Sequence, residues 1–455
     1  MTILPIDTGR YGTPEMKKIF EQESRLQRML DVEAALAWAH AEVGDISMKD
    51  ANRIGRMAST KYVKLERVKE IEKEIKHDVT SLVRALAEVC STSGAYVHLG
   101  ATSSDILDTA TALQLKEAIA LIEWRLNDFE GVLLEKAENY THTIMIGRTH
   151  GQHALPTTLG FKFSVWMREN ARHIQRLSEC KERLLVGKMS GAVGTQAGLG
   201  QNAAKIQELV MARLGIKTAD ISTQIVQRDR YAEFVALLGL VAASLENFAT
   251  EVRELQRPEI GELFEPFERA KQVGSSTMPH KRNPETCENI CGLARIVRSL
   301  VAPELENVVT WHERDLTQSS AERFVIPEAC ILIDHMLVKM IGVVSELVVD
   351  EKRMKKNIDL TQGLCMSESV MIALTRKGMS RQEAHEHLRV LTLKSETQML
   401  RFKAVLLGDK KVRKLLTAAE IDKALNPRNY LGTAVEQVKL MIEKTRKERK
   451  ARGLS

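Results

Sequence analysis

The sequence predicts an all-α protein in which long helices form a central bundle between two smaller helical domains. Only 10 prolines and 26 glycines occur in 455 residues, and aromatic residues make up 4% of the chain. Sandwiches, barrels and other β-rich folds need more turn residues and more aromatic side chains than this. The hydrophobic content of 44% can fill a large core, so a disordered chain is excluded.

Three helical domains are expected, over residues 1–107, 108–363 and 364–455. The middle domain is marked by apolar residues at steps of three and four, the spacing of one buried face on a long helix. The clearest stripe comprises Tyr231, Phe234, Leu238, Val241, Leu245, Phe248, Val252 and Leu255, and others run through 115–133 and 163–184. At 1.5 Å per residue such helices are about 35 to 45 Å long. Helices of that length favour a bundle shared between subunits.

No targeting or membrane segment is expected, and the protein is predicted to be cytoplasmic. Residues 1–16 contain no basic stretch followed by an apolar one, which a secretory signal would need. The most apolar long segment, 327–349, is interrupted by Asp334, Lys339 and Glu346, so it is predicted to be a buried core helix. The six cysteines form no CxxC pair, so reduced thiols are expected and no metal site.

The positive charge of the chain is concentrated at its C-terminus. Lys and Arg total 66 against 60 Asp and Glu, a formal charge of +6. The segment 439–452 holds seven basic and two acidic residues, so it carries +5 of that charge. The rest of the chain is nearly neutral, and we therefore expect no nucleic-acid partner.

Four segments of unusual composition are predicted to be loops that carry the chemistry, at 96–108, 147–160, 187–200 and 272–284. The glycine-rich segment 187–200 is a poor candidate for a phosphate cradle. It lacks the GxxxxGK[ST] pattern, and no strand of β-branched residues precedes it. Its glycines are expected to permit close helix approach instead.

The segment 272–284, called the signature loop below, is more specific because it contains GSSTMPHKRNP. It places the hydroxyls of Ser275 and Ser276 close to the cations Lys281 and Arg282. Such a loop can offer backbone N–H groups and positive charge to an anion. A solvated basic loop is the alternative for these residue types alone. His150, in GRTHGQHALPTT, taken alone is more typical of an exposed or capping residue than of a catalytic one.

Together with GRTHGQHALPTT and HLGATSSDILDTA, the signature loop resembles the fumarase/aspartase superfamily of homotetrameric elimination enzymes. KHD at 76–78 and WHERDLTQSSAER at 311–323 resemble the adenylosuccinate lyase family within it, as do GRYGTPEM and NPRNYLGTAVEQV near the two ends. The likeness runs from about Arg10 to Val438. It implies a homotetramer around the central bundle, with three of four subunits building each site.

The resemblance also implies a reaction: β-elimination of fumarate from adenylosuccinate, giving AMP, and from the related succinylated carboxamide ribotide. This chemistry needs a base, an acid for the departing nitrogen and cations for carboxylate charge. By resemblance Ser275 is the base and His150 the general acid, with His77 as the second candidate for the acid. No metal or organic cofactor is expected, because protein cations can meet the charge.

The small-molecule substrate carries a phosphate and carboxylates, so cations and hydroxyls must bind it. The resemblance assigns this binding to Arg10, Tyr11, Lys76, Asp78, Thr102, Ser103, Gln224, Ser276, Lys281, Arg282, Asn283, Asn289, Arg314, Ser319, Ser320 and Arg323. His98 is a further candidate for the pocket, and a structural role at a helix end is equally expected for it. For any one of these residues a surface ion pair or a helix cap is the alternative.

Three other interpretations are open at this stage. A carboxymuconate cycloisomerase-like enzyme has a similar signature loop, and argininosuccinate lyase belongs to the same superfamily. The KHD and HERDLTQSSAER segments argue against both. From a different class, the chain would be a helical scaffold that kept the fold and lost the activity. The intact set of Ser275, His150, His77, Lys281 and Asn283 argues against that interpretation.

Overall fold

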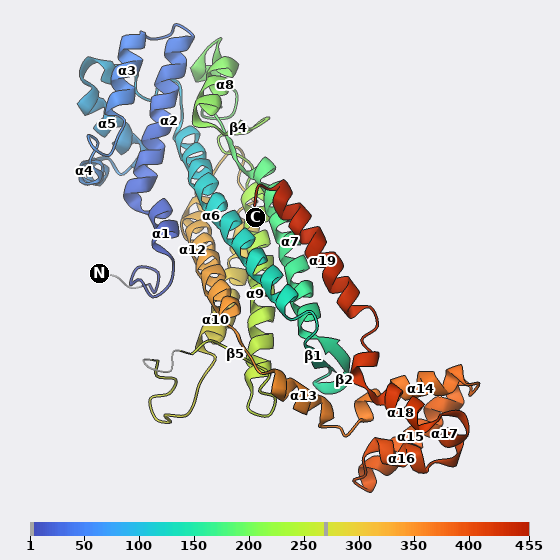
Figure 1. Ribbon diagram of the computed structural model, residues 1–455. Helices are drawn as coiled ribbons and strands as arrows, with labels where there is room; N and C mark the ends of the chain where they lie inside the picture. The colour runs from blue at the N-terminus through green and yellow to red at the C-terminus, as the bar shows by residue number, and fades with distance from the viewer. Residues whose placement is uncertain (1–3, 268–271, 455) are drawn as a thin grey trace. The chain divides into compact units, whose positions relative to one another are not determined.

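The structure, a computed structural model, describes residues 4–267 and 272–454 (Figure 1). Helices account for most of these residues, and the strands that the structure describes there form only two-stranded sheets. The prediction of an all-α protein is confirmed. By its contacts the chain divides into unit 1 (1–127, 172–245 and 292–338) and unit 2 (128–171, 246–291 and 339–455). The three-domain division stays a prediction.

Unit 1 begins with short capped helices around their own apolar core. Thr13 caps α1 by accepting a hydrogen bond from the Met16 N–H, and Pro14 occupies the first turn, where no N–H is needed. Ser47 caps α3 in the same way. These helices are α1 (Pro14–Phe20), α2 (Gln22–Glu42), α3 (Met48–Met57), α4 (Leu65–Ile75), α5 (Asp78–Cys90) and the 3-10 turn η1 (Ser91–Tyr96). Leu26, Leu30, Ile54 and Leu86 lie at the centre of the core that α2, α3 and α5 share.

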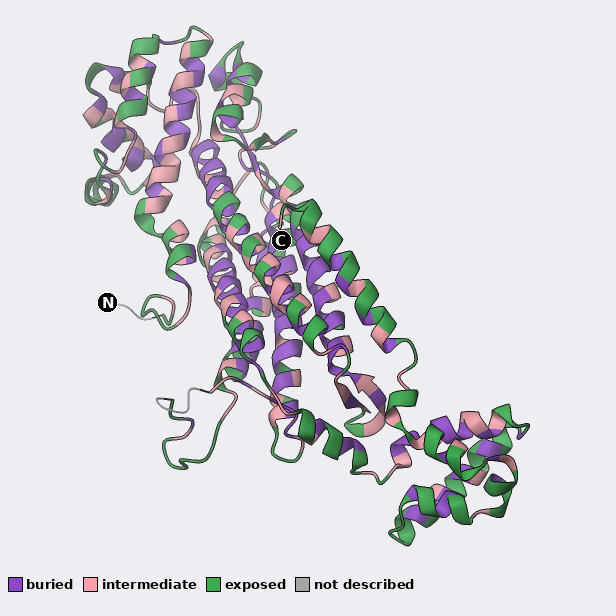
Figure 2. Cartoon of the chain, viewed as in Figure 1, coloured by how far each residue is buried: buried purple, intermediate pink, exposed green. Residues whose placement is uncertain are grey.

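Long helices follow, and three of them carry the predicted stripes as their buried faces. They are α6 (Ser103–Asn139), α7 (Leu159–Leu184), α9 (Asp229–Gln256), α10 (Glu285–Ser299) and α12 (Thr317–Ser345). Every member of the stripe from Tyr231 to Leu255 is at most 2% exposed, and Figure 2 shows α9 buried along most of its length. In unit 2 the rings of Phe129, Trp166 and Phe248 pack together from α6, α7 and α9. The prediction of long helices with one buried face is confirmed.

Of the three charges that interrupt the apolar segment 327–349, Asp334 is buried and paired, whereas Lys339 and Glu346 are exposed. Asp334 of α12 is fully buried, and it accepts hydrogen bonds from Thr13 and from the Arg125 guanidinium at 3.1 Å. Three elements of unit 1 therefore meet at one carboxylate, which satisfies the rule that a buried charge needs partners. By length and composition α9 could cross a membrane, but most of its apolar window is buried inside the protein.

The remaining elements complete the two units. Those of unit 1 are β3 (Val186–Gly187), η2 (Ala197–Leu199), α8 (Ala203–Leu214), β4 (Lys217–Thr218) and α11 (Val301–Glu306). Those of unit 2 are β1 (Ile144–Thr149), β2 (Gln152–Thr158), β5 (Leu263–Phe264), β6 (Val348–Val349), α13 (Glu351–Asp359), η3 (Leu364–Met366), α14 (Ser367–Arg376), α15 (Arg381–Thr397), α16 (Phe402–Gly408), α17 (Lys410–Leu415), α18 (Ala418–Leu425), η4 (Pro427–Asn429) and α19 (Ala434–Ala451). Helices α14 to α18 enclose a core of their own around Val370, Leu374 and Phe402.

The basic C-terminal helix α19 is bound to acidic residues of its own unit. Arg446 pairs with Glu138 at 2.7 Å, and Arg452 pairs with the fully buried Glu130. Glu448 of α19 in turn accepts a hydrogen bond from Arg168 of α7 at 2.6 Å. Part of the tail's positive charge is therefore paired inside the protein.

The close approach of α6 and α7 in unit 2 generates a stability prediction. A methyl group at Gly160 would meet backbone atoms of Ala137 and Thr141 at 2.7 Å, whereas one at Gly55 in α3 would meet nothing within 4 Å. We expect Gly160→Ala to lower the free energy of unfolding by about 1 to 3 kcal/mol through overpacking. Gly55→Ala should raise it by about 0.5 to 1 kcal/mol through helix propensity. Urea titration followed by circular dichroism measures both, and equal effects of the two variants would contradict the close-packing argument.

Candidate active site

His150 lies at the tip of a β-hairpin, where a loop was predicted. Strands β1 and β2 pair antiparallel, and His150 and Gly151 form the two-residue turn between them, with φ of 54° and 71°. Positive φ at both central residues is the type I′ pattern that suits hairpins. The expectation of an irregular loop was wrong because two strands flank this turn. Its position leaves the His150 side chain exposed.

The signature loop holds the oxygen of Ser275 against backbone N–H groups. Ser275 Oγ accepts hydrogen bonds from the N–H of Met278 at 3.0 Å and of Thr277 at 3.3 Å. The Asn283 side chain closes the loop by donating to the Gly274 carbonyl at 2.9 Å. Only glycine fits at 274, since a Cβ there would lie 2.4 Å from the Lys281 carbonyl oxygen. The loop is therefore a folded structure, although most of its side chains are exposed.

The other predicted residues near Ser275 in the sequence do not form a buried site. Ser276, Lys281 and Arg282 are exposed, and the Arg282 guanidinium lies over the Phe267 ring at 5.4 Å. Asn289, on α10, is exposed and donates to the Glu285 carbonyl one turn earlier. In unit 2 the structure thus gathers Ser275 and Asn283 closely and leaves the cations facing outward.

A pocket in unit 1 brings together eight of the predicted residues. Its volume is about 480 Å³, and it lies where α5, α6 and α12 begin. The predicted residues that line it are Lys76, His77, Asp78, Ser103, Arg314, Ser319, Ser320 and Arg323. The Arg323 guanidinium donates to the Asp78 carboxylate at 3.2 Å. Helix N-termini and arginines converge here, which is the arrangement that binds phosphate and carboxylate groups.

His77 is the N-cap of α5. Its Nδ1 accepts a hydrogen bond from the Thr80 N–H at 3.3 Å. Lys76, just before it, ends α4 in the left-handed conformation with φ of 55°. The sharp bend between α4 and α5 turns both side chains toward the pocket.

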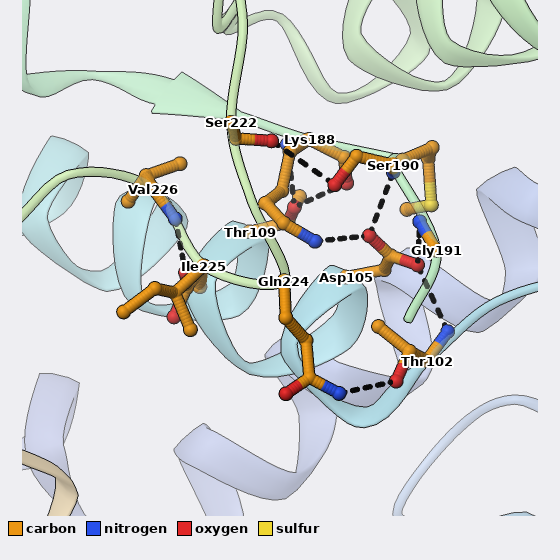
Figure 3. A network of polar contacts seen from close by, with 12 residues as sticks. Thr102, Asp105, Thr109, Lys188, Ser190, Gly191, Ser222, Gln224, Ile225 and Val226 are labelled. Atoms are coloured by element: carbon orange, nitrogen blue, oxygen red, sulfur yellow. Dashed lines mark hydrogen bonds and ion pairs between the residues drawn. The ribbon is translucent and has the colours of Figure 1, made fainter. Parts of the chain in front are cut away.

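Thr102 and Gln224 are fixed beside the start of α6 by a partly buried network (Figure 3). Gln224 donates to Thr102 Oγ1 at 3.1 Å, and Arg314 donates to Gln224 Oε1 at 3.5 Å. The Asp105 carboxylate accepts hydrogen bonds from the N–H groups of Thr102, Ser190 and Gly191 at 2.8 to 3.1 Å. It also pairs with Lys188, whose side chain is fully buried. Ser190 and Gly191 thus donate to a carboxylate of the chain itself, so these two N–H groups are already paired.

Five predicted residues of unit 1 do not line this pocket: Thr102 and Gln224, described above, and His98, Arg10 and Tyr11. His98 donates from its backbone and its Nδ1 to Glu33, at 3.1 and 2.6 Å. Burial lowers the pKa of His98, but the hydrogen bond and the charge of Glu33 outweigh it, so the pKa is raised. This geometry fits the structural alternative. Arg10 is exposed, and the half-buried Tyr11 ring packs edge-on against His335 at 5.6 Å.

Sequence reasoning missed several charged residues near the pocket. Arg25 of α2 shares a smaller adjoining cavity with Arg314 and Arg323, and burial together with Arg323 lowers its pKa. No motif marks Arg25, since it lies in an ordinary amphipathic helix. Asp105 did have a signal, because TSSD at 102–105 fits the capping-box pattern in which the fourth residue binds the first N–H.

Similarity to known proteins decides the family. Residues 9–299 match the family model described as lyase, and residues 363–441 match the one described as adenylosuccinate lyase C-terminus. The adenylosuccinate lyase of Methanocaldococcus jannaschii is 50% identical, over 99% of this chain and 97% of that protein. The one of Pyrococcus horikoshii is 51% identical over 100% of both chains. The chain belongs to the adenylosuccinate lyase family.

Solved structures agree at the level of the superfamily. A fumarate lyase from Mesorhizobium sp. BNC1 superposes with a TM-score of 0.89 at 33% identity, covering 95% of this chain and 98% of that one. The 3-carboxy-cis,cis-muconate lactonizing enzyme from Pseudomonas putida gives 0.89 at 34% identity, covering 98% and 99%. The muconate enzyme was the nearest rival, and the higher identity to the lyases decides against it. The predicted resemblance is confirmed, and the chain is a carbon–nitrogen lyase.

The network around Asp105 generates a stability prediction. Asp105→Asn leaves the buried Lys188 ammonium without a counter-charge, and breaking one partner of a buried pair costs about 3 to 5 kcal/mol of unfolding free energy. The matched control is Glu182→Gln, which breaks the Lys217–Glu182 pair, whose side chains are 62% and 65% exposed. It should leave the unfolding midpoint in urea unchanged within error. A midpoint for Asp105→Asn equal to that of the control would contradict the buried-pair argument.

Proposed function

We propose that this chain eliminates fumarate from adenylosuccinate to give AMP, and from the succinylated aminoimidazole carboxamide ribotide to give the free carboxamide ribotide, in purine nucleotide biosynthesis in the cytoplasm. Membership of the adenylosuccinate lyase family supports the reaction. The single observation that carries it in the structure is the unit 1 pocket of about 480 Å³, where predicted cations and hydroxyls converge.

Ser275 is assigned the role of base. Its Oγ takes the proton from the carbon beside the succinyl carboxylate, and the electron pair forms the double bond of fumarate as the carbon–nitrogen bond breaks. A serine oxygen is a poor base in water, so its alkoxide must be stabilised. The N–H groups of Thr277 and Met278 point at this oxygen in the loop and support that role.

His150 is assigned the role of general acid, which donates a proton to the departing nitrogen. The hairpin tip presents the imidazole outward, where it can reach a substrate. His77 is the weaker candidate because its Nδ1 already accepts the Thr80 N–H. A neutral His77 therefore carries its proton on Nε2, which suits donation to a phosphate oxygen. Protonating Nδ1 for acid catalysis would break the cap of α5.

Binding of the substrate anions is assigned to the unit 1 pocket and to the signature loop. Arg314 and Arg323 suit a bidentate grip on phosphate or carboxylate, and Ser103, Ser319 and Ser320 stand at helix starts with N–H groups beside them. The binding roles of Arg10, Tyr11, Thr102, Gln224, Lys281 and Asn283 rest on the family resemblance. No step of this proposal needs a metal or an organic cofactor.

We further propose a homotetramer with sites shared between subunits. Large apolar side chains are exposed on α9 to α12 of unit 1 and on the loop before α12, among them Leu240, Ile296, Leu305, Trp311 and Phe324. Exposed apolar residues in such number are typical of protein interfaces. Trp311 is 77% exposed in the single chain, a large cost unless another surface covers it.

The reaction is tested by an adenylosuccinate assay that follows the ultraviolet change as the purine loses its succinyl group. The wild type should turn over, and Ser275→Ala and His150→Ala should each lower kcat by at least about a hundredfold. His77→Ala should mainly raise KM, because it loses a binding contact. Sedimentation controls for assembly. Near-normal kcat in Ser275→Ala or His150→Ala would remove the assigned role, and loss of kcat alone in His77→Ala would transfer the acid role to His77.

Shared sites are tested by mixing two inactive variants. Ser275→Ala carries its defect in unit 2, and Arg323→Gln, a pocket variant, carries its defect in unit 1. When the two proteins are unfolded together and refolded, mixed tetramers should regain activity, because some sites receive both intact residues from different chains. Each variant refolded alone is the control. Activity of the mixture no higher than the mean of the separate variants would show that each site comes from one chain.

A further inference from the structure

Two buried carboxylates lie three residues apart around strand β5 of unit 2, and they hold different partners. Glu262 is fully buried and binds the Arg148 guanidinium through both oxygens, at 2.8 and 2.9 Å. Arg148 belongs to β1 and stands two residues before His150. A bidentate pair fixes direction as well as distance. Glu262 therefore anchors the hairpin close to the tip that carries His150.

Asn357 of α13 fixes the orientation of Glu262. Its side chain donates to Glu262 at 2.7 Å and to the Ile260 carbonyl at 2.8 Å. The Glu262 carbonyl in turn accepts the Asp350 N–H at 3.0 Å. Both ends of this residue are therefore held, and its carboxylate cannot rotate freely away from Arg148.

Glu265 caps α10, the helix that follows the signature loop. Its two carboxylate oxygens accept the N–H groups of Thr286 and Cys287, each at 2.9 Å. The residue before α10 is Pro284, whose ring offers no oxygen to cap the helix. An uncapped helix start leaves N–H groups unsatisfied. A residue from a distant part of the chain thus fixes the point at which the signature loop enters its helix.

Gln256 also links the segment that contains Glu265 to the signature loop. At the end of α9 it accepts the Glu265 N–H at 2.9 Å and donates to the Arg282 carbonyl at 3.2 Å. The segment 261–265 is itself held by pairing of β5 with β6. One short, fixed strand thereby supports both the hairpin with His150 and the returning limb of the loop with Ser275.

We propose that Glu262 and Glu265 are positioning residues for the elimination, Glu262 for His150 and Glu265 for Ser275. The inference rests on the proposed function for its chemistry. Neither carboxylate contacts His150 or Ser275 directly; each acts through the element that presents one of them. A displacement of about 1 Å of a catalytic group can cost about a hundredfold in rate. Both glutamates therefore affect kcat more than they affect KM.

The experiment compares Glu262→Gln and Glu265→Gln with Glu130→Gln. Glutamine keeps the shape of the side chain, but its amide nitrogen cannot accept the backbone N–H groups or neutralise Arg148. Glu130 is the matched control, because it is equally buried and ion-paired but its partners are Arg449 and Arg452 of the tail. Each site variant should lose at least about tenfold in kcat with KM changed less than about threefold. Glu130→Gln should lose thermal stability and keep kcat within twofold.

A second measurement separates positioning from a general weakening of the fold. In the His150→Ala background, Glu262→Gln should cause no further loss of kcat, and Glu265→Gln should likewise add nothing in the Ser275→Ala background. The same tenfold loss in either background would overturn the positioning role. If a glutamine variant does not fold, Arg148→Lys replaces Glu262→Gln, since it keeps the charge and loses the bidentate geometry. Glu265→Asp replaces Glu265→Gln, since it is too short to hold both N–H groups.

Amide hydrogen exchange tests, without an activity assay, whether Glu262 and Glu265 hold their segments in place. Glu262→Gln should raise exchange over 144–158 and Glu265→Gln over 272–290, with neither segment changed in Glu130→Gln. Raised exchange in a chain whose wild type does not turn over adenylosuccinate would overturn the proposed function and keep the two anchors. An active wild type with unchanged kcat in both glutamine variants would overturn the positioning role alone.

Discussion

The buried carboxylate of Asp105 is the contact on which the unit 1 pocket depends. It accepts three backbone N–H groups and a buried ammonium, so four bonds from two separate segments end on one side chain. These bonds fix the start of α6, and with it Thr102, Ser103 and Gln224. A charge in the protein interior is tolerated only when it is fully paired. The cost of burying it is therefore met by the same contacts that hold the pocket wall in place.

Buried, paired carboxylates also occur in unit 2, where they hold a hairpin and a loop and not a pocket wall. Glu262 and Glu265 are also buried carboxylates that bind groups far away in the sequence. A hydrogen bond to a charged acceptor is shorter and more directional than an apolar contact, so it can hold a loop or a hairpin that has little core of its own. Exposed elements with catalytic candidates need such anchors, because packing alone does not fix them. The helical bundle supplies stability, and the buried carboxylates supply geometry.

The sequence predicted the bundle well because helical periodicity is local. The stripe from Tyr231 to Leu255 is readable from one segment, and its burial follows from amphipathicity. The site was predicted by motif, residue by residue, and eight of those residues meet in one pocket. Arg25, Lys188 and Glu262 were missed, since their importance comes from partners distant along the chain. The hairpin at His150 was missed because neither strand has a long alternating pattern.

The exposure of the signature loop makes assembly part of the proposed mechanism. Backbone N–H groups stabilise an alkoxide strongly only where water is excluded, since the high dielectric of water weakens every such interaction. In the single chain Ser275 is half-buried, while Ser276, Lys281 and Arg282 are exposed. The surface that excludes water must therefore come from the substrate, from another chain or from both. A weak base such as the Ser275 hydroxyl, on an exposed loop, can catalyse the elimination only when substrate binding and subunit assembly complete the site around it.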